Sequence, residues 1–132
     1  PAKIFMGDAG STFLGAIYAG LLLQTESWSQ ALGLILIATP LFGDAFFCVL
    51  RRIYAGHKIF QPHKLHLYQR LHQAGWSHLK VSSLYCIATF SLALTFLLTN
   101  LQCVLIIASL QIFAGFLLDK YTAIPFQLKR KL

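Results

Sequence analysis

Residues 81–118, VSSLYCIATFSLALTFLLTNLQCVLIIASLQIFAGFLL, contain no charged side chain. A helix that crosses the hydrocarbon core of a bilayer needs about 20 mostly apolar residues. The stretch is long enough for two such helices, because the polar Asn100 divides it into residues 81–99 and 101–118. This part of the sequence therefore predicts two adjacent transmembrane helices joined by a short turn.

The composition of the whole chain agrees with this interpretation. Of its 132 residues, 57% are hydrophobic and 11% are charged, and the net charge is +7. Soluble domains usually carry about 25% charged residues, so a soluble globular class is excluded. The chain is interpreted as an integral membrane protein, and we expect no nucleic-acid partner.

Two further apolar stretches precede this pair of spans. Residues 31–50 are long enough to cross a bilayer, although Pro40 and Asp44 interrupt them. Residues 11–24 are shorter and cross it only if the helix is tilted. We therefore predict an all-α, polytopic membrane helix bundle of about four transmembrane helices, forming one domain over residues 1–132.

Positive charge gathers in segments that lie outside the predicted spans. The long loop 51–80 carries six lysines and arginines and the tail 129–131 is entirely basic, whereas the connection 25–30 has no basic residue. An excess of lysine and arginine marks cytoplasmic loops. Four spans then place residues 1–11, the loop 51–80 and the C-terminus on the cytoplasmic face.

The segment Gly7-Asp8-Ala9-Gly10-Ser11 places one carboxylate between two glycines at the start of the first span. Glycine permits positive φ and the close approach of a ligand. The start of a helix presents unpaired N–H groups that suit a phosphate, and Ser11 is the expected N-cap. Asp8 is a candidate Mg²⁺ ligand, because Mg²⁺ binds one or two carboxylates together with phosphate oxygens. The alternative is an ordinary helix start with a solvated aspartate.

Asp44 is the one acidic residue inside an apolar stretch, where a carboxylate is costly and becomes a candidate functional group. Its i, i+7 spacing to Arg51 puts both side chains on one face of a helix. Two interpretations stay open. Asp44 is either a functional carboxylate or a structural one that pairs with Arg51 or with a neighbouring helix.

The loop 51–80 contains all five histidines and no Asp, Glu or Cys. Only His63 and His66 are spaced to share a helical face. Zinc sites usually pair ligands at short spacing and add cysteine or carboxylate partners, so the loop is predicted to be a poor metal cage and a good host for phosphates. The alternative is a basic loop resting on anionic lipid headgroups. The cysteines lie in apolar runs and are interpreted as small buried hydrophobes. They are Cys48, Cys86 and Cys103.

Taken together, these segments resemble the polyprenyl-phosphate sugar-1-phosphate transferases, a membrane family also called glycosyltransferase family 4. Residues 5–11 (FMGDAGS) are similar to its F-M-G-D-x-G-S signature, residues 40–52 to its P-x-x-x-D-x-x-x-x-x-x-R-R helix end, and residues 60–75 to its histidine loop. The resemblance covers residues 1–84. Where many relatives read H-x-H-H, residues 66–69 read HLYQ, a form similar to the subgroup that acts on deoxy-amino sugars.

The resemblance implies transfer of a sugar-1-phosphate from a UDP-sugar to undecaprenyl phosphate or a related polyprenyl phosphate, with release of UMP. The implied donor sugar is an N-acetylhexosamine or a deoxy-amino sugar, and the implied process is the initiating step of O-antigen or cell-surface polysaccharide assembly at the bacterial inner membrane. The family's upstream Asp-Asp pair is absent and the chain opens on Pro1, so it is interpreted as the C-terminal part of a longer protein.

The family also implies roles for individual residues. Asp8 and His66 are the implied catalytic residues, and Asp8 is the implied ligand of Mg²⁺, with Mn²⁺ as an alternative. The implied substrate-binding residues are Gly10, Ser11, Lys64, Arg70, Arg51 and Arg52. Membrane lipid is a further expected partner, and a homodimer stays open. The competing interpretations are a non-catalytic membrane fragment, inactive by itself, and a transporter segment.

Overall fold

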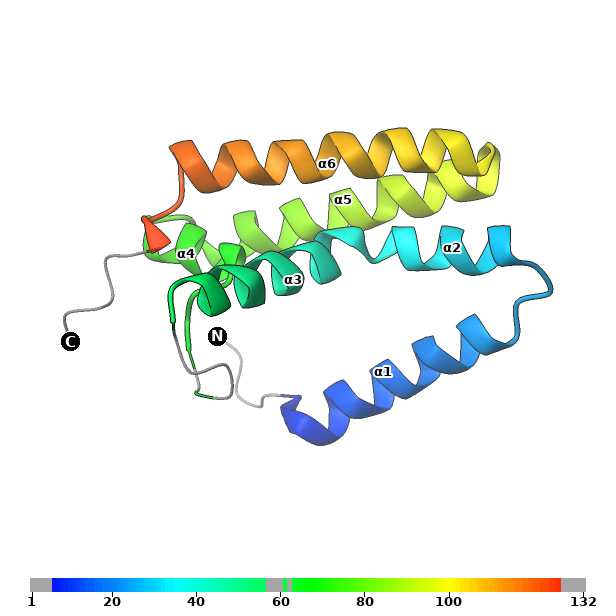
Figure 1. Ribbon diagram of the computed structural model, residues 1–132, viewed down its shortest axis with the longest axis horizontal. Coiled ribbons are helices and arrows are strands. Elements are labelled where there is room, and N and C mark those ends of the chain that lie inside the picture. The colour runs from blue at the N-terminus through cyan, green and yellow to red at the C-terminus, as the bar shows by residue number, and fades with distance from the viewer. Residues whose placement is uncertain (1–5, 57–60, 62, 127–132) are drawn as a thin grey trace.

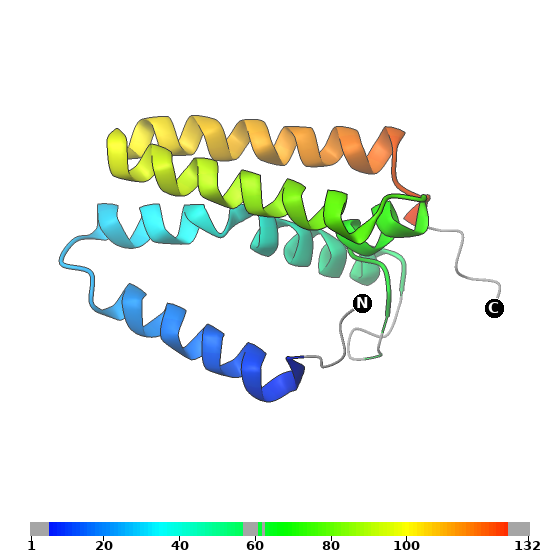
Figure 2. The same ribbon diagram turned by 180° about the vertical axis from the view of Figure 1, so that it is seen from behind.

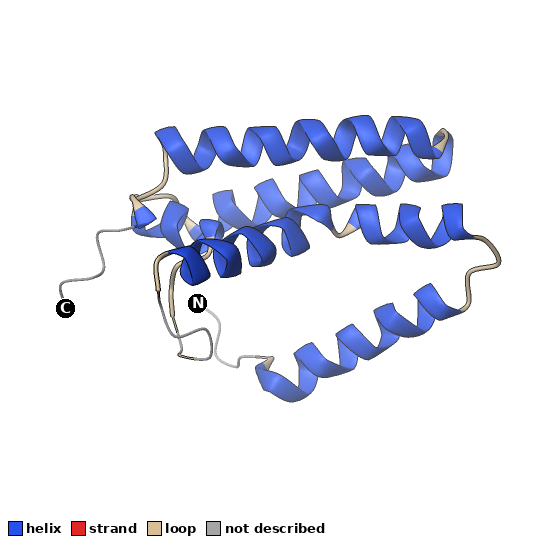
Figure 3. Cartoon of the chain, in the orientation of Figure 1, coloured by secondary structure: helices blue, strands red, loops and turns tan. Residues whose placement is uncertain are grey.

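The computed structural model describes residues 6–56, 61 and 63–126, and over that part of the chain it is built from helices and connecting loops (Figures 1 and 3). The helices are α1 (Gly7–Leu23), α2 (Trp28–Ile37), α3 (Thr39–Tyr54), α4 (Leu67–Gln73), α5 (His78–Leu98) and α6 (Leu101–Tyr121). No strand occurs among the described residues, so the predicted all-α class is confirmed.

Helices α5 and α6 are the two spans that the uncharged stretch predicts. Each is 21 residues long, and each is apolar enough to cross a membrane. The Asn100 side chain separates them, because its Oδ1 accepts the Cys103 N–H at 3.1 Å and so caps the first turn of α6. Ser77 caps α5 in the same way, accepting the Lys80 N–H at 3.2 Å.

Helices α2 and α3 occupy the predicted span 31–50, but they form a bent pair rather than one continuous helix. The two axes meet at 72°, with Ala38 between them. Pro40 explains the break, because proline lacks a backbone N–H and its ring clashes with the carbonyl of residue i−4. By length and composition, the described chain then contains two membrane-spanning helices, or three if the bent pair is one span. Helix α1, of 17 residues, is shorter than these, and the count of four stays a prediction.

The segment predicted as the loop 51–80 is partly helical. Helix α3 continues to Tyr54, and α4 occupies residues 67–73. Glycine ends each of these helices: Gly56 has a φ of 68° and Gly75 a φ of 98°. After α4, Gly75 N–H donates to the His72 carbonyl and Trp76 N–H to the Leu71 carbonyl, which closes the helix in a Schellman turn. The non-helical part of residues 51–80 is therefore shorter than predicted, and the turn at Gly75 sets the direction of the chain from α4 into α5.

A small core lies where α2, α5 and α6 meet. Leu92 and Val104 are fully buried there, and Ala108 is almost so. Gly33 lets α2 approach α5, because a Cβ at this position would lie 2.1 Å from the Phe96 ring. Most other large apolar side chains point outward, as is expected of helices that face lipid.

The helices are arranged as a bundle (Figures 1 and 2). Helices α5 and α6 run side by side in opposite directions, with α2 and α3 along one flank. Helix α1 contacts α2, where the Tyr18 hydroxyl donates to the Leu34 carbonyl. The start of α1, the end of α3, α4, the start of α5 and the end of α6 all lie at one end of the bundle. The polar residues predicted to act together are therefore gathered at that end.

Candidate functional site

The glycine-rich segment forms the first turn of α1. Gly7 has a φ of 65°, which favours glycine, and Asp8 follows it as an exposed carboxylate. The prediction that Ser11 is the N-cap is wrong. Met6 occupies that position, and the Ser11 hydroxyl instead donates to the Asp8 carbonyl at 3.0 Å. The helix begins earlier because Gly7, not Ser11, makes the turn into it.

Gly10 lies against the side chain of Met6. A Cβ on Gly10 would lie 2.2 Å from Cγ of Met6, so the exposed Met6 side chain would have to move. Gly7 thus has a local structural reason in its positive φ, and the Asp8 carboxylate remains exposed to solvent.

The Asp44 carboxylate accepts hydrogen bonds from both α4 and α5. It accepts the Leu67 N–H at 2.7 Å and the Tyr68 N–H at 3.4 Å, at the start of α4. It also accepts the Tyr85 hydroxyl at 2.9 Å. The side chain is 7% exposed. Of the interpretations left open, the structure supports pairing with neighbouring helices, and Arg51 is not the partner.

His66 is the N-cap residue of α4 and sits beside this carboxylate. Its Nδ1 lies 3.7 Å from Oδ1 of Asp44, and its backbone N–H donates to Oε1 of Gln69 at 3.3 Å. The ring is stacked between His63 and Tyr68, at centroid distances of 5.0 and 5.6 Å. A quarter of the side chain is exposed. His66 is therefore fixed in place yet reachable from solvent.

Asp119, near the end of α6, gathers two of the predicted substrate-binding arginines. Its carboxylate contacts Arg51 at 2.5 Å and also binds Arg70. Arg70 is buried and donates from Nε to the Ile124 carbonyl at 2.7 Å, while both guanidinium groups face the Phe126 ring. Arg51 is 35% exposed and is the one of this pair that is open to a ligand.

The remaining predicted residues lie close by on the same end. Arg52 is buried, and its Nη2 donates to the Gln61 carbonyl at 3.1 Å. Lys64 has an exposed side chain, and its backbone carbonyl accepts Nε2 of Gln73 at 3.1 Å. The basic tail and His57 fall outside the described residues.

Electrostatics at this end follow from burial and from neighbouring charge. Burial lowers the pKa of His63, and the positive charges of Arg52 and His66 lower it further. Burial raises the pKa of the Tyr68 phenol, and the carboxylate of Asp44 raises it as well. Both groups are accordingly neutral near pH 7.

A cavity of about 190 Å³ lies among α3, α4, α5 and α6, next to these groups. Its lining is mostly apolar, and Gln111 reaches into it from α6. Nε2 of Gln111 donates to the Ala88 carbonyl at 3.0 Å and to Oγ of Ser91 at 2.9 Å, while its buried Oε1 has no partner within the described part of the chain. The charged or hydroxyl-bearing lining residues are Asp44, Arg51, Arg70, Tyr85, Thr39 and Asp119.

The structure thus places five of the predicted residues together and leaves the three on α1, Asp8, Gly10 and Ser11, apart from them. His66, Lys64, Arg51, Arg52 and Arg70 lie on α3, on α4 or between them. Asp8 lies on α1 and forms no ion pair with any described residue.

Three residues that contact the predicted site residues or Asp44 were not predicted from the sequence. They are Asp119, Tyr85 and Gln69. Asp119 alone carried a signal, because it is one of four acidic residues and directly follows the last apolar run.

Comparison with known proteins finds curated relatives that are named as transferases of phosphorylated sugar units. The chain is 40% identical over 83 residues to a probable undecaprenyl-phosphate N-acetylglucosaminyl 1-phosphate transferase of Bacillus subtilis, covering 59% of this chain and 23% of that protein. It is 34% identical over 121 residues to an undecaprenyl-phosphate alpha-N-acetylglucosaminyl 1-phosphate transferase of Pasteurella multocida, covering 88% and 33%. A phospho-N-acetylmuramoyl-pentapeptide-transferase of Carboxydothermus hydrogenoformans is 35% identical over 96 residues, covering 71% and 28%.

These matches span only part of each relative. The chain covers between 23% and 33% of the length of these three curated proteins. No protein-family model matches the chain, and no solved structure matches it significantly.

Proposed function

Because the chain belongs to the polyprenyl-phosphate sugar-1-phosphate transferase family, we propose that it forms part of the machinery that moves a sugar-1-phosphate from a UDP-sugar to undecaprenyl phosphate. In this reaction a phosphate oxygen of the lipid attacks the phosphorus attached to the sugar. The bond from that phosphorus to the oxygen bridging the two donor phosphates breaks, and UMP leaves with the bridging oxygen. Both reactants are anions, so the protein must make their approach tolerable.

The observation that carries this proposal is the gathering of His66 and the basic residues at the end of the bundle where α1 starts. That end corresponds to the cytoplasmic face of the bacterial plasma membrane in the proposed orientation, where a water-soluble UDP-sugar is available. His66 is held by its neighbours at the start of α4 and stays accessible, so it can contact the donor diphosphate without first being ordered.

Asp8 is the proposed ligand of Mg²⁺, with Mn²⁺ as an alternative. The residue suits this role, because it is an exposed carboxylate at a helix start with room for water and phosphate oxygens in the remaining positions. When bound, the cation would neutralise charge on the donor diphosphate. The N–H groups left unpaired in the first turn of α1, at residues 7–9, would bind phosphate oxygens, with Gly10 and Ser11 next to them in the chain.

The arginines divide into two roles in this proposal. Arg51, one-third exposed at the cavity, attracts the lipid phosphate, and Lys64 approaches the donor from the solvent side. Arg70 and Arg52 are buried and hold the loop through carbonyl oxygens, so they position the site. The apolar cavity beside Arg51 suits the first part of a polyprenyl chain.

The donor class that we propose is an N-acetylhexosamine or deoxy-amino sugar, and the reaction would initiate assembly of an O-antigen or another cell-surface polysaccharide. The relatives named above differ in the sugar unit that their names give, so the family by itself leaves the donor open.

The test is UMP release by the natural full-length protein in detergent with undecaprenyl phosphate and a UDP-N-acetylhexosamine. Asp8→Asn and His66→Ala should each lower kcat/KM by about 100-fold or more, as expected for a lost charge-stabilising group. The matched controls are Glu26→Gln, an exposed acid at the other end of the bundle, and His72→Ala, an exposed histidine on α4. Near-normal turnover of either site variant, or equal losses in its control, would refute that residue's role.

A further inference from the structure

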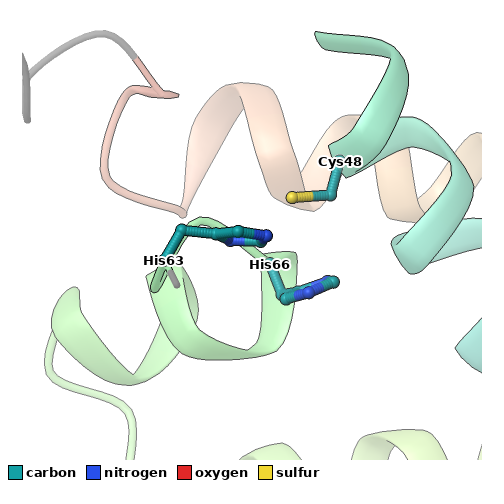
Figure 4. A group of neighbouring side chains, drawn as sticks. All are labelled: Cys48, His63 and His66. Atoms are coloured by element: carbon teal, nitrogen blue, oxygen red, sulfur yellow. The ribbon is translucent and has the colours of Figure 1, made fainter. Parts of the chain in front are cut away.

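A cysteine and two histidines converge at the junction of α3 and α4 (Figure 4). Sγ of Cys48 and one ring nitrogen from each of His63 and His66 lie within 4.8 Å of one another. Cys48 is 4% exposed, and both histidines are half-buried. The loop by itself was predicted to be a poor metal cage, but the third ligand comes from the preceding helix, α3.

The distances are close to those of a bound ion. Zinc lies about 2.3 Å from sulfur and about 2.0–2.1 Å from nitrogen, so ligand atoms of a tetrahedral site are about 3.3–3.6 Å apart. The ligand atoms, at most 4.8 Å apart, have to approach one another by up to about 1.2–1.5 Å, which side-chain rotation supplies. Three protein ligands leave a fourth position for water on the open side of the histidines.

Neighbouring groups already orient one of the ligands. Nδ1 of His66 lies 3.7 Å from Oδ1 of Asp44, and its ring stacks against those of His63 and Tyr68, so the imidazole is held in place beside the carboxylate. Nδ1 of His63 accepts only a long hydrogen bond, 3.4 Å from the Leu65 N–H, so its lone pair is weakly engaged. The arrangement therefore needs little rebuilding to accept an ion.

The charges around the cluster partly oppose and partly favour a cation. The charged groups that act on Cys48 are Asp44 and the guanidinium groups of Arg52, Arg70 and Arg51. Arg70 and Arg51 share the carboxylate of Asp119, and Arg52 donates to a backbone carbonyl. When a cation binds, the thiol proton passes to solvent, and the resulting thiolate adds a second negative charge to that of Asp44.

We propose that Cys48, His63 and His66 form a binding site for Zn²⁺. Thiolate and imidazole ligands select Zn²⁺ and other borderline or soft cations, whereas Mg²⁺ requires oxygen ligands. This site is separate from the Mg²⁺ position at Asp8. If the proposed function is also correct, Zn²⁺ at this cluster occupies His66 and competes with the UDP-sugar. That consequence rests on the proposed function, but the binding itself does not.

The experiment uses the natural full-length protein, purified through a tag without histidine and titrated with Co²⁺ as a spectroscopic substitute for Zn²⁺. We expect one Co²⁺ per protein, with the visible absorption of a tetrahedral site and a thiolate charge-transfer band. Zn²⁺ should remove both signals, and millimolar Mg²⁺ should not. Cys48→Ser should abolish the charge-transfer band, and His63→Gln should weaken Co²⁺ binding by about 100-fold.

Cys103→Ser and Cys86→Ser are the matched controls and should leave the spectrum unchanged, since both cysteines lie away from the cluster. A charge-transfer band that survives Cys48→Ser, or that disappears in a control variant, would overturn the proposal. Thermal unfolding of each variant without metal distinguishes a lost ligand from a lost fold. A Cys48→Ser protein that unfolds like wild type and still gains thermal stability from Zn²⁺ would equally refute the site. Each readout is direct binding, so it is independent of transferase activity.

Discussion

Asp119→Asn tests whether the carboxylate at the end of α6 holds the polar end of the bundle together. Arg70 has only 4% of its side chain exposed, and Asp119 is the carboxylate that pairs with it among the described residues. Removing one partner of a buried ion pair destabilises a protein by about 3–5 kcal/mol, because the other charge stays buried without compensation. The asparagine retains an oxygen acceptor, and Arg70 keeps its bond to the Ile124 carbonyl. We therefore expect the lower end, about 3 kcal/mol.

The ion pair between Arg51 and Asp119 provides the control for this prediction. Arg51 is 35% exposed, so its pair with Asp119 is worth at most about 1 kcal/mol. Equilibrium unfolding in detergent should therefore show a loss of about 3 kcal/mol for Asp119→Asn, roughly a 100-fold change in the folding equilibrium, and at most about 1 kcal/mol for Arg51→Gln. The double variant with Arg70→Gln should recover part of the loss, since no buried charge is left unpaired. Equal effects of Asp119→Asn and Arg51→Gln, or no coupling in the double variant, would refute the reasoning.

The remaining predictions concern close approach and helix ends. Gly33→Ala should destabilise the protein by about 1–3 kcal/mol in the same unfolding assay, because the new methyl group would lie 2.1 Å from the Phe96 ring; Gly43→Ala, in open space, is its control. Asp44→Asn should lower stability by about 2 kcal/mol through weaker bonds to the N–H groups of α4, and should raise hydrogen exchange there while leaving α6 unchanged. Gly75→Ala should lose about 1–2 kcal/mol because φ is 98° at that position, and an unchanged midpoint would exclude strain.

The spans were predictable because their signal is local. An uncharged run of about 20 residues indicates a transmembrane helix wherever it lies in a fold, and the structure has α5 and α6 where that signal is strongest. Pro40 was recognised as an interruption, but the 72° between α2 and α3 depends on how each half packs against α5 and α6. Sequence therefore gives the place of the break and not its angle.

The contacts of the site were predictable only in part. Side chains separated by one or two helical turns can be placed from spacing alone, yet Asp119 lies 49 residues from Arg70. Spacing also could not predict that Cys48 lies near His63. Cys48 belongs to α3, whereas His63 belongs to a loop whose path depends on α4. The i, i+7 spacing left Arg51 as a possible partner of Asp44. In the structure the Asp44 carboxylate instead binds two N–H groups at the start of α4, and Arg51 pairs with Asp119.

The departure of residues 66–69 from the family's H-x-H-H pattern has a physical explanation in these contacts. Tyr68 and Gln69 occupy the positions of the second and third histidines, and both contact His66: the Tyr68 ring stacks on its imidazole, and Oε1 of Gln69 accepts its backbone N–H. Asp44 binds this turn through the backbone N–H groups of residues 67 and 68, which any residue except proline supplies. Neither feature requires histidine. The two positions can therefore vary while His66 stays fixed at the start of α4, so a chemical role for the loop should depend on His66 and not on the number of histidines beside it.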